Sequence, residues 1–258
     1  MKISFDLHTH TVYSHGKGTI AENAMSAKEK GLSGIAITDH GFSHPVYGMR
    51  RRKLDEMRER CVEAEKESGI KVLLGIESNV RGISGRIDVE ERDYDKLDVV
   101  LAGVHKLIIC DRPVDTFKML VVDNLWDVFK WKPSQRLIKY NTTCYINAIK
   151  NNPIDVITHV NYGCPCDPVE VAKCAADYGT YIEISTKKTH LSLEQWQDVI
   201  DKTNARFVVD SDAHSVDRIG DSALAEKLFK EINFPAERIA NIDGKMPALR
   251  FGEFKKHR

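Results

Sequence analysis

The sequence lacks a net charge and lacks any long apolar run. Its 38 lysine and arginine residues balance its 38 aspartate and glutamate residues, so no overall field attracts the chain to nucleic acid or to an anionic membrane surface. The amino terminus reaches Asp6 and His8 without an apolar stretch of signal-peptide length, and no later segment has the roughly 18 apolar residues of a membrane span. We therefore expect a cytoplasmic protein without a membrane partner.

A disulfide framework and flexible linkers are also lacking. Six cysteines scattered over 258 residues do not form the dense pattern of a secreted domain, and we interpret them as reduced thiols, mostly in the core. Cys164 and Cys166 could bind a soft ion, but two thiols do not complete a zinc site and a loop is the better interpretation. Without a Pro-, Gly- or Ser-rich linker, the chain is expected to form one domain over residues 1–258.

Short, β-branched apolar runs recur along the chain and alternate with helical patterns. Continuous hydrophobicity of this kind is typical of strands buried on both faces. Helix starts are marked by a capping box at Thr19 and Glu22, by Asp167 before Pro168, and by Ser192. The pattern predicts an α/β fold with a parallel sheet that right-handed crossovers can close into a barrel. Seven strands are expected, at residues 3–7, 35–38, 72–76, 99–104, 156–158, 181–184 and 207–209.

Histidines and carboxylates follow the ends of six of these strands. A lone histidine in such a place is more often structural than a ligand, but here seven of the ten histidines lie within a few residues of strand ends. The carboxyl ends of barrel strands form the active site, so these side chains would converge on one rim. Imidazole and carboxylate groups together suit zinc, manganese and iron. The residues assigned to this rim are His8, His10, His15, Asp39, His40, Glu77, His105, His159, Asp212 and His214.

Short motifs around these residues resemble the ordered motifs of the PHP family, named for polymerase and histidinol phosphatase. They are His-Thr-His at 8–10, Ile-Thr-Asp-His at 37–40, Gly-Ile-Glu at 75–77, Gly-Val-His at 103–105, Thr-His at 158–159 and Asp-Ser-Asp-Ala-His at 210–214. The chain is most similar to the small stand-alone bacterial PHP phosphatases. The resemblance implies a distorted (β/α)7 TIM-like barrel with parallel strands and a site for three divalent transition-metal ions (Zn, Mn or Fe).

The resemblance also implies how the ligands are shared among the three ions. One ion would be held by His8, His10, Glu77 and Asp212, a second by His15, His40 and His214, and a third by Glu77, His105 and His159. Glu77 would then bridge two ions. Glu77 and Asp212 are expected to be catalytic through the ion that activates water. Asp39 is included with them as an acceptor that orients a neighbouring imidazole.

The activity that follows is hydrolysis of phosphate monoesters of small molecules by metal-activated hydroxide. The cations proposed to bind the phosphorylated substrate are Arg50, Arg51 and Arg52, which form a basic run with Lys53, together with Lys106 and Arg218. For the basic run, a solvated helix end is an equally good interpretation. Lys187 and Lys188 are further candidates.

A long insertion at about residues 106–152 is a candidate lid or pocket wall and is expected to contain two helices. Its residues Trp126, Phe129 and Trp131 would either face the core or belong to that lid.

Three alternatives remain open at the level of the sequence. A histidinol phosphatase is a narrower form of the same activity, although no imidazole-binding pocket is recognisable. A PHP-type exonuclease is disfavoured by the zero net charge, so we do not expect nucleic acid as a partner. A degenerate PHP domain acting as a scaffold is disfavoured by the complete ligand set, because converging polar groups without metal repel one another. The natural substrate, the physiological metal and the oligomeric state are not determined by the sequence.

Overall fold

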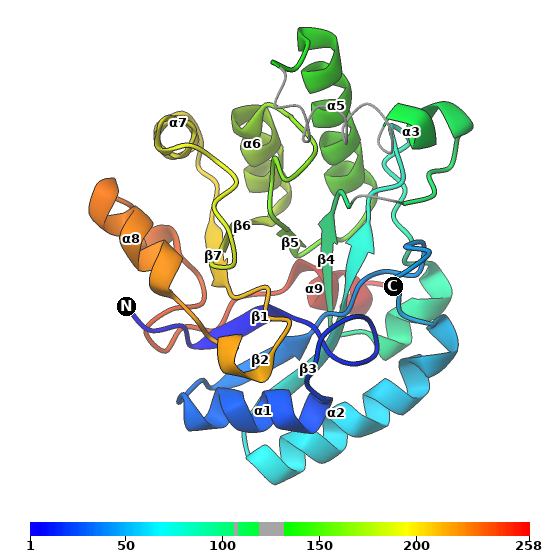
Figure 1. Ribbon diagram of the computed structural model, residues 1–258, viewed down its shortest axis with the longest axis vertical. Helices are drawn as coiled ribbons and strands as arrows, with labels where there is room; N and C mark the ends of the chain where they lie inside the picture. Colours follow the sequence, from blue (N-terminus) through cyan, green and yellow to red (C-terminus); the bar gives the residue numbers. More distant parts are fainter. Residues whose placement is uncertain (106–107, 119–131) are drawn as a thin grey trace.

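Seven parallel strands form a single sheet in the order in which they occur along the chain (Figure 1). A computed structural model describes residues 1–105, 108–118 and 132–258. Lys106 and the aromatic residues at 126, 129 and 131 therefore lie outside the described residues. The strands are β1 (Phe5–Thr9), β2 (Gly34–Ile37), β3 (Lys71–Asn79), β4 (Val99–Gly103), β5 (Val156–Ile157), β6 (Tyr181–Ser185) and β7 (Phe207–Asp210).

The first and last strands approach each other, so that the sheet forms a nearly closed barrel. Thr9 and Ala213 form a parallel bridge just beyond the end of β7, and the His10 amide donates to the Ala213 carbonyl at 2.9 Å. Lower in the barrel, the Asn241 side chain joins the two strands by donating 2.8 Å hydrogen bonds to the Phe5 and Val209 carbonyls. The prediction of a distorted (β/α)7 barrel is confirmed.

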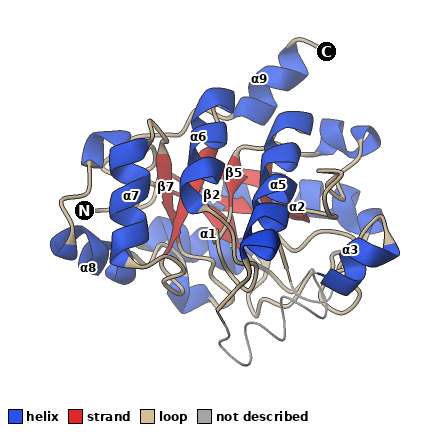
Figure 2. Ribbon diagram, turned by 90° about the horizontal axis from the view of Figure 1, so that it is seen from above, coloured by secondary structure: helices blue, strands red, loops and turns tan. Residues whose placement is uncertain are grey.

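Helices cover the outside of the barrel, as the view from above shows (Figure 2). The three expected helix starts are confirmed: Thr19 and Ser192 form capping boxes, and Asp167 accepts from two amides. The described α-helices are α1 (Ile20–Glu29), α2 (Leu54–Ser68), α3 (Pro113–Phe117), α5 (Gln135–Asn151), α6 (Pro168–Tyr178), α7 (Leu193–Lys202), α8 (Ala223–Glu231) and α9 (Arg250–Lys256). The described 3-10 helices are η1 (Arg51–Lys53), η2 (Glu91–Lys96), η4 (Val216–Arg218) and η5 (Ala236–Arg238). Helices α3 and α5 both lie in the segment 106–152, where two helices were expected.

Two apolar cores hold the barrel together. A small inner core fills the barrel with buried side chains that include Phe5, Leu73 and Leu101. A larger outer core packs the helices against the sheet, and the six cysteines are buried. Because apolar side chains fill the interior, the polar groups gather at the carboxyl ends of the strands. Within the described part of the chain, no helix is both long enough and apolar enough to cross a membrane.

Candidate metal centre

Strand β1 and the residue just after it bring two imidazoles together. His8 Nε2 and His10 Nε2 lie 3.1 Å apart, as expected for side chains that leave the same face of an extended segment. His8 Nδ1 lies 2.5 Å from Oε1 of Glu183 on β6, a contact that directs Nε2 of His8 toward the other candidate ligands. Both histidines are completely buried or nearly so.

Glu77 lies at the centre of the cluster. Its Oε1 is 2.7 Å from His159 Nε2 and 2.9 Å from His105 Nε2. Its Oε2 is 2.9 Å from His40 Nδ1 and 3.3 Å from His8 Nε2. Strand β3 thus places a fully buried carboxylate whose two oxygens face imidazoles from four other parts of the barrel.

The remaining candidate ligands lie on the β1–β7 side of Glu77. Asp212 Oδ1 is 3.2 Å from His10 Nε2 and 3.7 Å from His8 Nε2. The His15 ring stacks on His40 with a centroid distance of 4.7 Å and lies 4.1 Å from the ring of His214. All nine side chains assigned to metal from the sequence therefore lie in one cluster.

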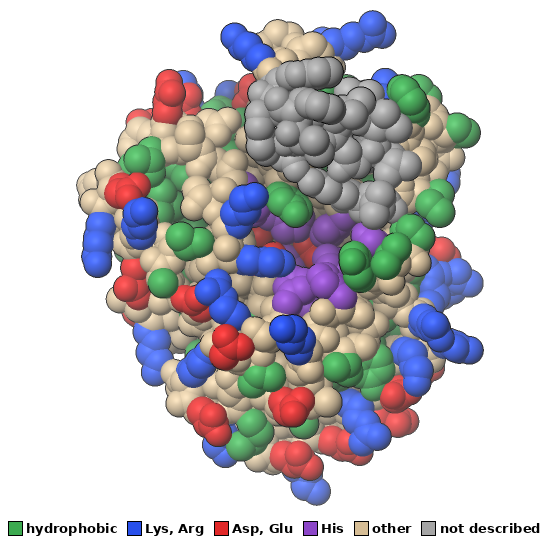
Figure 3. All heavy atoms as spheres, viewed as in Figure 1, with side chains coloured by type: hydrophobic (Ala, Val, Ile, Leu, Met, Phe, Trp, Pro, Cys, Tyr) green, Lys and Arg blue, Asp and Glu red, His purple; other side chains and the backbone are tan. Residues whose placement is uncertain are grey.

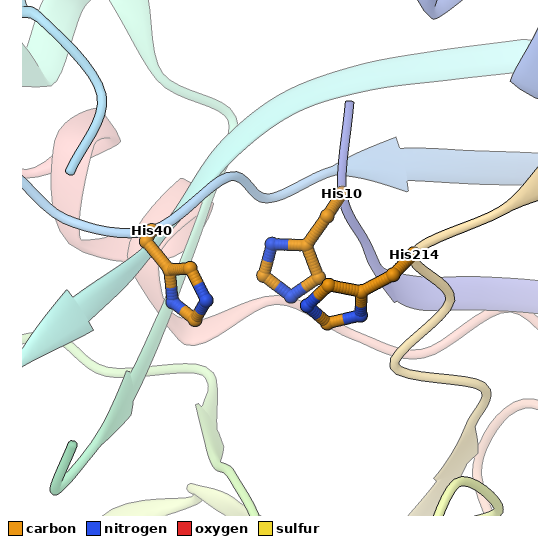
Figure 4. Close-up of side chains that lie close together, drawn as sticks. All are labelled: His10, His40 and His214. Carbon is orange, nitrogen blue, oxygen red and sulfur yellow. The ribbon is translucent and has the colours of Figure 1, made fainter. Parts of the chain in front are cut away.

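Three sets within the cluster have ligand atoms that all lie within 4.8 Å of one another. They are His10 with His40 and His214, shown in Figure 4, then His8 with His10 and Glu77, and His40 with Glu77 and His105. These sets overlap through His10, His40 and Glu77. They differ from the three groups implied by the resemblance in three respects. His10 takes the place of His15 beside His40 and His214, His40 takes the place of His159 beside Glu77 and His105, and Asp212 is not in the set with His8, His10 and Glu77.

Several buried ligand atoms make no hydrogen bond to the described residues. They are His10 Nδ1, His40 Nδ1, Glu77 Oε2, His105 Nε2 and His159 Nδ1. The short contact between His40 Nδ1 and Glu77 Oε2 lacks hydrogen-bond geometry. A buried polar atom without a partner costs free energy, and a bound cation would remove that cost for the atoms that face the cluster. The nitrogen and oxygen donors present fit zinc, manganese or iron.

Most of the protonation states suit a cation. The exceptions are His8 and His159: burial opposes their charged forms, but the surrounding carboxylates raise the pKa of both imidazoles. Burial, reinforced by neighbouring imidazoles, holds the pKa of His10 well below its usual range. Burial lowers the pKa of His15 to about 4 and that of His40 to about 3. Burial alone would raise the pKa of Glu77 and Asp212, but the surrounding histidines hold both well below the usual value. Neutral imidazoles and ionised carboxylates are the forms that bind metal.

Two candidate ligands have unusual backbone conformations. His159 and Asp212 have positive φ angles of 29° and 45°, in a region that residues other than glycine rarely adopt. Such strain persists only where the surrounding structure enforces it, and it is concentrated at functional sites. For His159, the Glu183 carboxylate contributes to that enforcement by accepting a 2.6 Å hydrogen bond from the His159 amide.

Glu183 was not identified from the sequence. It contacts His8 and the His159 amide at once, and it is 2% exposed. The available signal was a lone carboxylate inside the apolar run Tyr-Ile-Glu-Ile-Ser. A charged side chain in a strand buried on both faces needs a partner, and here that partner is an imidazole of the candidate metal centre.

Asp39 was expected to act as an acceptor that orients a neighbouring imidazole, and its hydrogen bonds to the described residues go to the loop after His10. Asp39 accepts hydrogen bonds from the Thr11 amide at 2.8 Å, the Thr11 hydroxyl at 2.6 Å and the Ser14 hydroxyl at 2.5 Å. The carboxylate therefore holds the loop that leads from His10 to His15. Its influence on the imidazoles acts through the backbone of that loop.

The arginines proposed to bind substrate have other partners or lie elsewhere. Arg51 pairs with Glu90 at 3.0 Å, donates to the Asp88 carbonyl and lies over the ring of Phe42. Arg218 pairs with Asp221 at 2.7 Å and donates to the Thr186 carbonyl. Arg50 and Arg52 are exposed. None of the four lines the cavity over the cluster, to judge from the described residues.

Two lysines line that cavity instead, and they come from the loop after β6. Lys187 Nζ lies 3.1 Å from Asp212 Oδ2 and 3.1 Å from His214 Nδ1. The cavity has a volume of about 460 Å³, and Figure 3 shows histidine side chains gathered in a hollow of this face beside basic side chains. Its described lining consists of His15, His40, His44, Tyr47, Glu77, His105, His159, Tyr162, Lys187, Lys188, His190, Asp212 and His214.

The fold and the cluster define a parallel β/α barrel with a candidate polynuclear metal centre at the carboxyl rim of its strands. The PHP domain model matches residues 6–204, and the chain belongs to the PHP family. Asp212 and His214 lie beyond the matched segment. The predicted family membership is thereby confirmed.

Similar proteins cover nearly the whole chain. A probable phosphatase from Caldanaerobacter subterraneus subsp. tengcongensis is 33% identical over 254 residues, which is 93% of this chain and 88% of the relative. A probable phosphatase from Tolumonas auensis is 30% identical over 256 residues, 93% of this chain and 90% of the relative.

Solved structures share the fold at low sequence identity. Histidinol phosphate phosphatase from Lactococcus lactis, in complex with zinc, L-histidinol and phosphate, is 14% identical with a TM-score of 0.55, covering 90% of this chain and 94% of that one. A putative histidinol phosphatase from Listeria monocytogenes is 13% identical with a TM-score of 0.57, covering 86% and 99%.

Proposed function

We propose that this protein hydrolyses phosphate monoesters of small molecules at a cluster of three divalent transition-metal ions. At the coarser level it is a PHP-family phosphoesterase, an enzyme of the hydrolase class. The observation that carries the finer proposal is the buried Glu77 carboxylate, whose two oxygens contact different imidazoles. A carboxylate can bridge two ions, whereas a neutral imidazole binds one through a single lone pair.

Three groups of residues would hold the ions. His8, His10 and Asp212 would hold one ion together with Glu77, and His105 and His159 would hold another on the far side of the same carboxylate. The third group is His15, His40 and His214, whose rings pack against one another. His10 and His40 lie near more than one group, which is consistent with ions a few ångströms apart.

Bound ions would supply a water of lowered pKa and would polarise the phosphoryl oxygens. Side chains that contact the candidate ligands would orient those ligands or bind the substrate. Glu183 keeps Nε2 of His8 directed at the cluster, and Asp39 holds the loop that carries His15. Lys187 contacts Asp212 and His214, which are both candidate ligands. When those two groups bind an ion, the Lys187 ammonium needs another anion, and the phosphoryl group of a substrate at the cluster would provide one.

The size and charge of the cavity favour a small substrate. A volume of about 460 Å³ is in the range of small-molecule sites, which is roughly 300–1,000 Å³. The relatives named probable phosphatases support a monoester in general. The Lactococcus lactis protein binds L-histidinol and phosphate, so histidinol phosphate is the first named compound to test. No feature of the described residues favours the exonuclease alternative, and the net charge is zero.

The test measures metal content and activity in the same preparations. Protein purified without chelator and supplied with manganese, zinc or iron is expected to retain three ions per chain and to hydrolyse several phosphate monoesters. Glu77→Gln keeps the shape of the side chain but removes its charge, so ions and turnover should both be lost. The matched control is Glu29→Gln on the exposed surface of α1. Wild-type protein that binds no ion and releases no phosphate from any monoester would contradict the proposal.

A further inference from the structure

The two oxygens of the Glu77 carboxylate have different surroundings. Oε1 accepts a 3.0 Å hydrogen bond from the hydroxyl of Thr158, whereas Oε2 makes no hydrogen bond to the described residues. Thr158 directly follows β5, and its amide donates to the Ala102 carbonyl of β4 at 3.0 Å. The side chains of Thr158 and Glu77 are both fully buried. The hydroxyl therefore belongs to the framework of the barrel and not to a mobile surface loop.

The Thr158 hydroxyl has one proton and two acceptors near it. Oε1 of Glu77 lies at 3.0 Å and Nε2 of His159 at 3.3 Å. An ionised carboxylate oxygen also forms stronger hydrogen bonds than a neutral acceptor does. Distance and charge thus both direct the proton to Oε1 of Glu77.

This hydrogen bond limits what else Oε1 can bind. A carboxylate oxygen offers about two lone-pair sites, and the Thr158 proton occupies one of them at Oε1. The Nε2 atoms of His105 and His159 lie 2.9 and 2.7 Å from the same oxygen. His105 Nε2 makes no hydrogen bond to the described residues despite that short distance, so a cation shared with Oε1 would satisfy both atoms. Oε1 has room for one such cation, whereas Oε2 keeps both of its sites.

Gly103, the last residue of β4, leaves the space for the hydroxyl. A Cβ at this position would lie 2.3 Å from Thr158 Oγ1 and 2.9 Å from His159 Cε1. Both distances are too short for a side-chain contact, so any larger residue would displace the hydroxyl or the ring. The Gly-Val-His motif at 103–105 thus supplies a candidate ligand and also the space beside Glu77.

We infer that Thr158 is a positioning residue of the metal centre. Its hydroxyl fixes the rotation of the Glu77 carboxylate and limits Oε1 to one ion, the ion held with His105 and His159. This inference rests on the proposed function and adds a residue to the same site. Without the hydroxyl, the ion at Oε1 is the one that loosens. Ions that bind through Oε2 are affected less, because the hydroxyl bonds to Oε1.

The test is competition between a chelator and manganese-loaded protein, followed by metal analysis. Thr158→Val keeps the shape of the side chain but removes the donor. It should release one ion at a chelator concentration about 10- to 100-fold lower than the wild-type protein does, the effect typical of a partner that orients a ligand. Thr158→Ser restores the hydroxyl and should retain its ions as the wild type does. Anomalous scattering from crystals of the partly stripped valine variant should show the loss beside His105 and His159.

Thr180→Val is the matched control. Thr180 is also buried and its hydroxyl donates to the Ile154 carbonyl at 2.8 Å, but it precedes β6, at the end of the barrel away from the cluster. This variant loses one buried hydrogen bond without any effect on Glu77, so its metal retention should not change. Gly103→Ala is an independent variant, because the added Cβ displaces the hydroxyl and should loosen the same ion. Circular dichroism checks folding, and Gly103→Ala decides if Thr158→Val does not fold.

Each outcome has a distinct meaning. Retention of every ion by folded Thr158→Val as tightly as by the wild-type protein would overturn the inference and leave the phosphatase proposal intact. Equal loosening of all ions, or the same loss in Thr158→Ser or Thr180→Val, would also overturn it, because the effect would then come from packing and not from the bond to Oε1. Wild-type protein that retains no ion would instead overturn the proposed function.

Discussion

Asn79 donates a hydrogen bond from Nδ2 to Asp88 Oδ2 at 2.6 Å, and its Oδ1 lies 2.8 Å from His105 Nδ1. Asp88 also accepts from the amide and the hydroxyl of Ser43, both at 2.8 Å. The carboxylate therefore joins the loop that follows His40 to the ring of His105. Because Nδ1 of His105 faces the Asn79 oxygen, its Nε2 is directed at Glu77.

Replacing Asp88 by Asn should weaken metal retention by about 10- to 100-fold, the effect typical of partners that orient a ligand. The expected cause is a loss of orientation at His105, with less effect on the remaining ligands. The measurement is competition with a chelator of known affinity, followed by metal analysis. Asp177→Asn, on the exposed surface of α6, is the control. If Asp88→Asn retained metal as well as the wild-type protein, the hydrogen bond between Asn79 and Asp88 would not be needed to orient His105.

Lys187→Met should raise KM for a phosphate monoester by roughly 10- to 100-fold, as expected when a hydrogen bond to a charged group of about 1.5–3 kcal/mol is lost. Metal content should not fall, because Lys187 opposes cation binding beside Asp212 and His214. Arg50→Met tests the basic run in the same assay and should leave KM nearly unchanged, since Arg50 is exposed and does not line the cavity. If Arg50→Met raised KM and Lys187→Met left it unchanged, the basic run would instead be the binding site for the phosphoryl group.

Removing metal should lower the melting temperature. The ligand atoms of the cluster lie close together and several are buried without a hydrogen-bond partner among the described residues, so ions that bind only the folded state stabilise it. At a free-ion concentration 100 times Kd, one site contributes about 2.7 kcal/mol. Thermal melts with chelator, with added ion, and of Glu77→Gln with the same ion would measure this. Identical melting temperatures in all three samples would argue against a metal site in this cluster.

Asp155 should make stability depend on pH independently of the metal centre. Burial raises its pKa to about 7 from 3.8, against the amides of Phe251 and Val100 that bind its oxygens. Between these values the folded protein holds a proton that the unfolded chain releases. The free energy of unfolding should therefore fall as pH rises, with the contribution fully present below 3.8 and lost above about 7.

The check is urea unfolding of metal-stripped protein from pH 4.5 to 7.5. Asp155→Asn should flatten this dependence, whereas Asp201→Asn on the exposed end of α7 should retain it. Equal slopes in the wild-type protein and Asp155→Asn would show that Asp155 does not titrate in this range.

The sequence by itself determined the barrel and the candidate ligands. Strands buried on both faces produce continuous apolar runs, and helix starts depend on residues three apart, as at Thr19 and Glu22. Parallel strands end on one rim, so His8, Glu77 and His105 could be expected to converge without knowledge of any distance. These features are local, and each can be recognised within a short stretch of chain.

Only the tertiary structure decided the partners of these groups. Glu183 reaches His8 across 175 residues of sequence, and no local pattern specifies that contact. Arg51 and Lys187 are equivalent in sequence as cations after strands, yet Arg51 pairs with Glu90 while Lys187 faces the cluster. Selection of a partner depends on which side chains are brought within a few ångströms, and in a barrel this is set by the packing of loops from different strands.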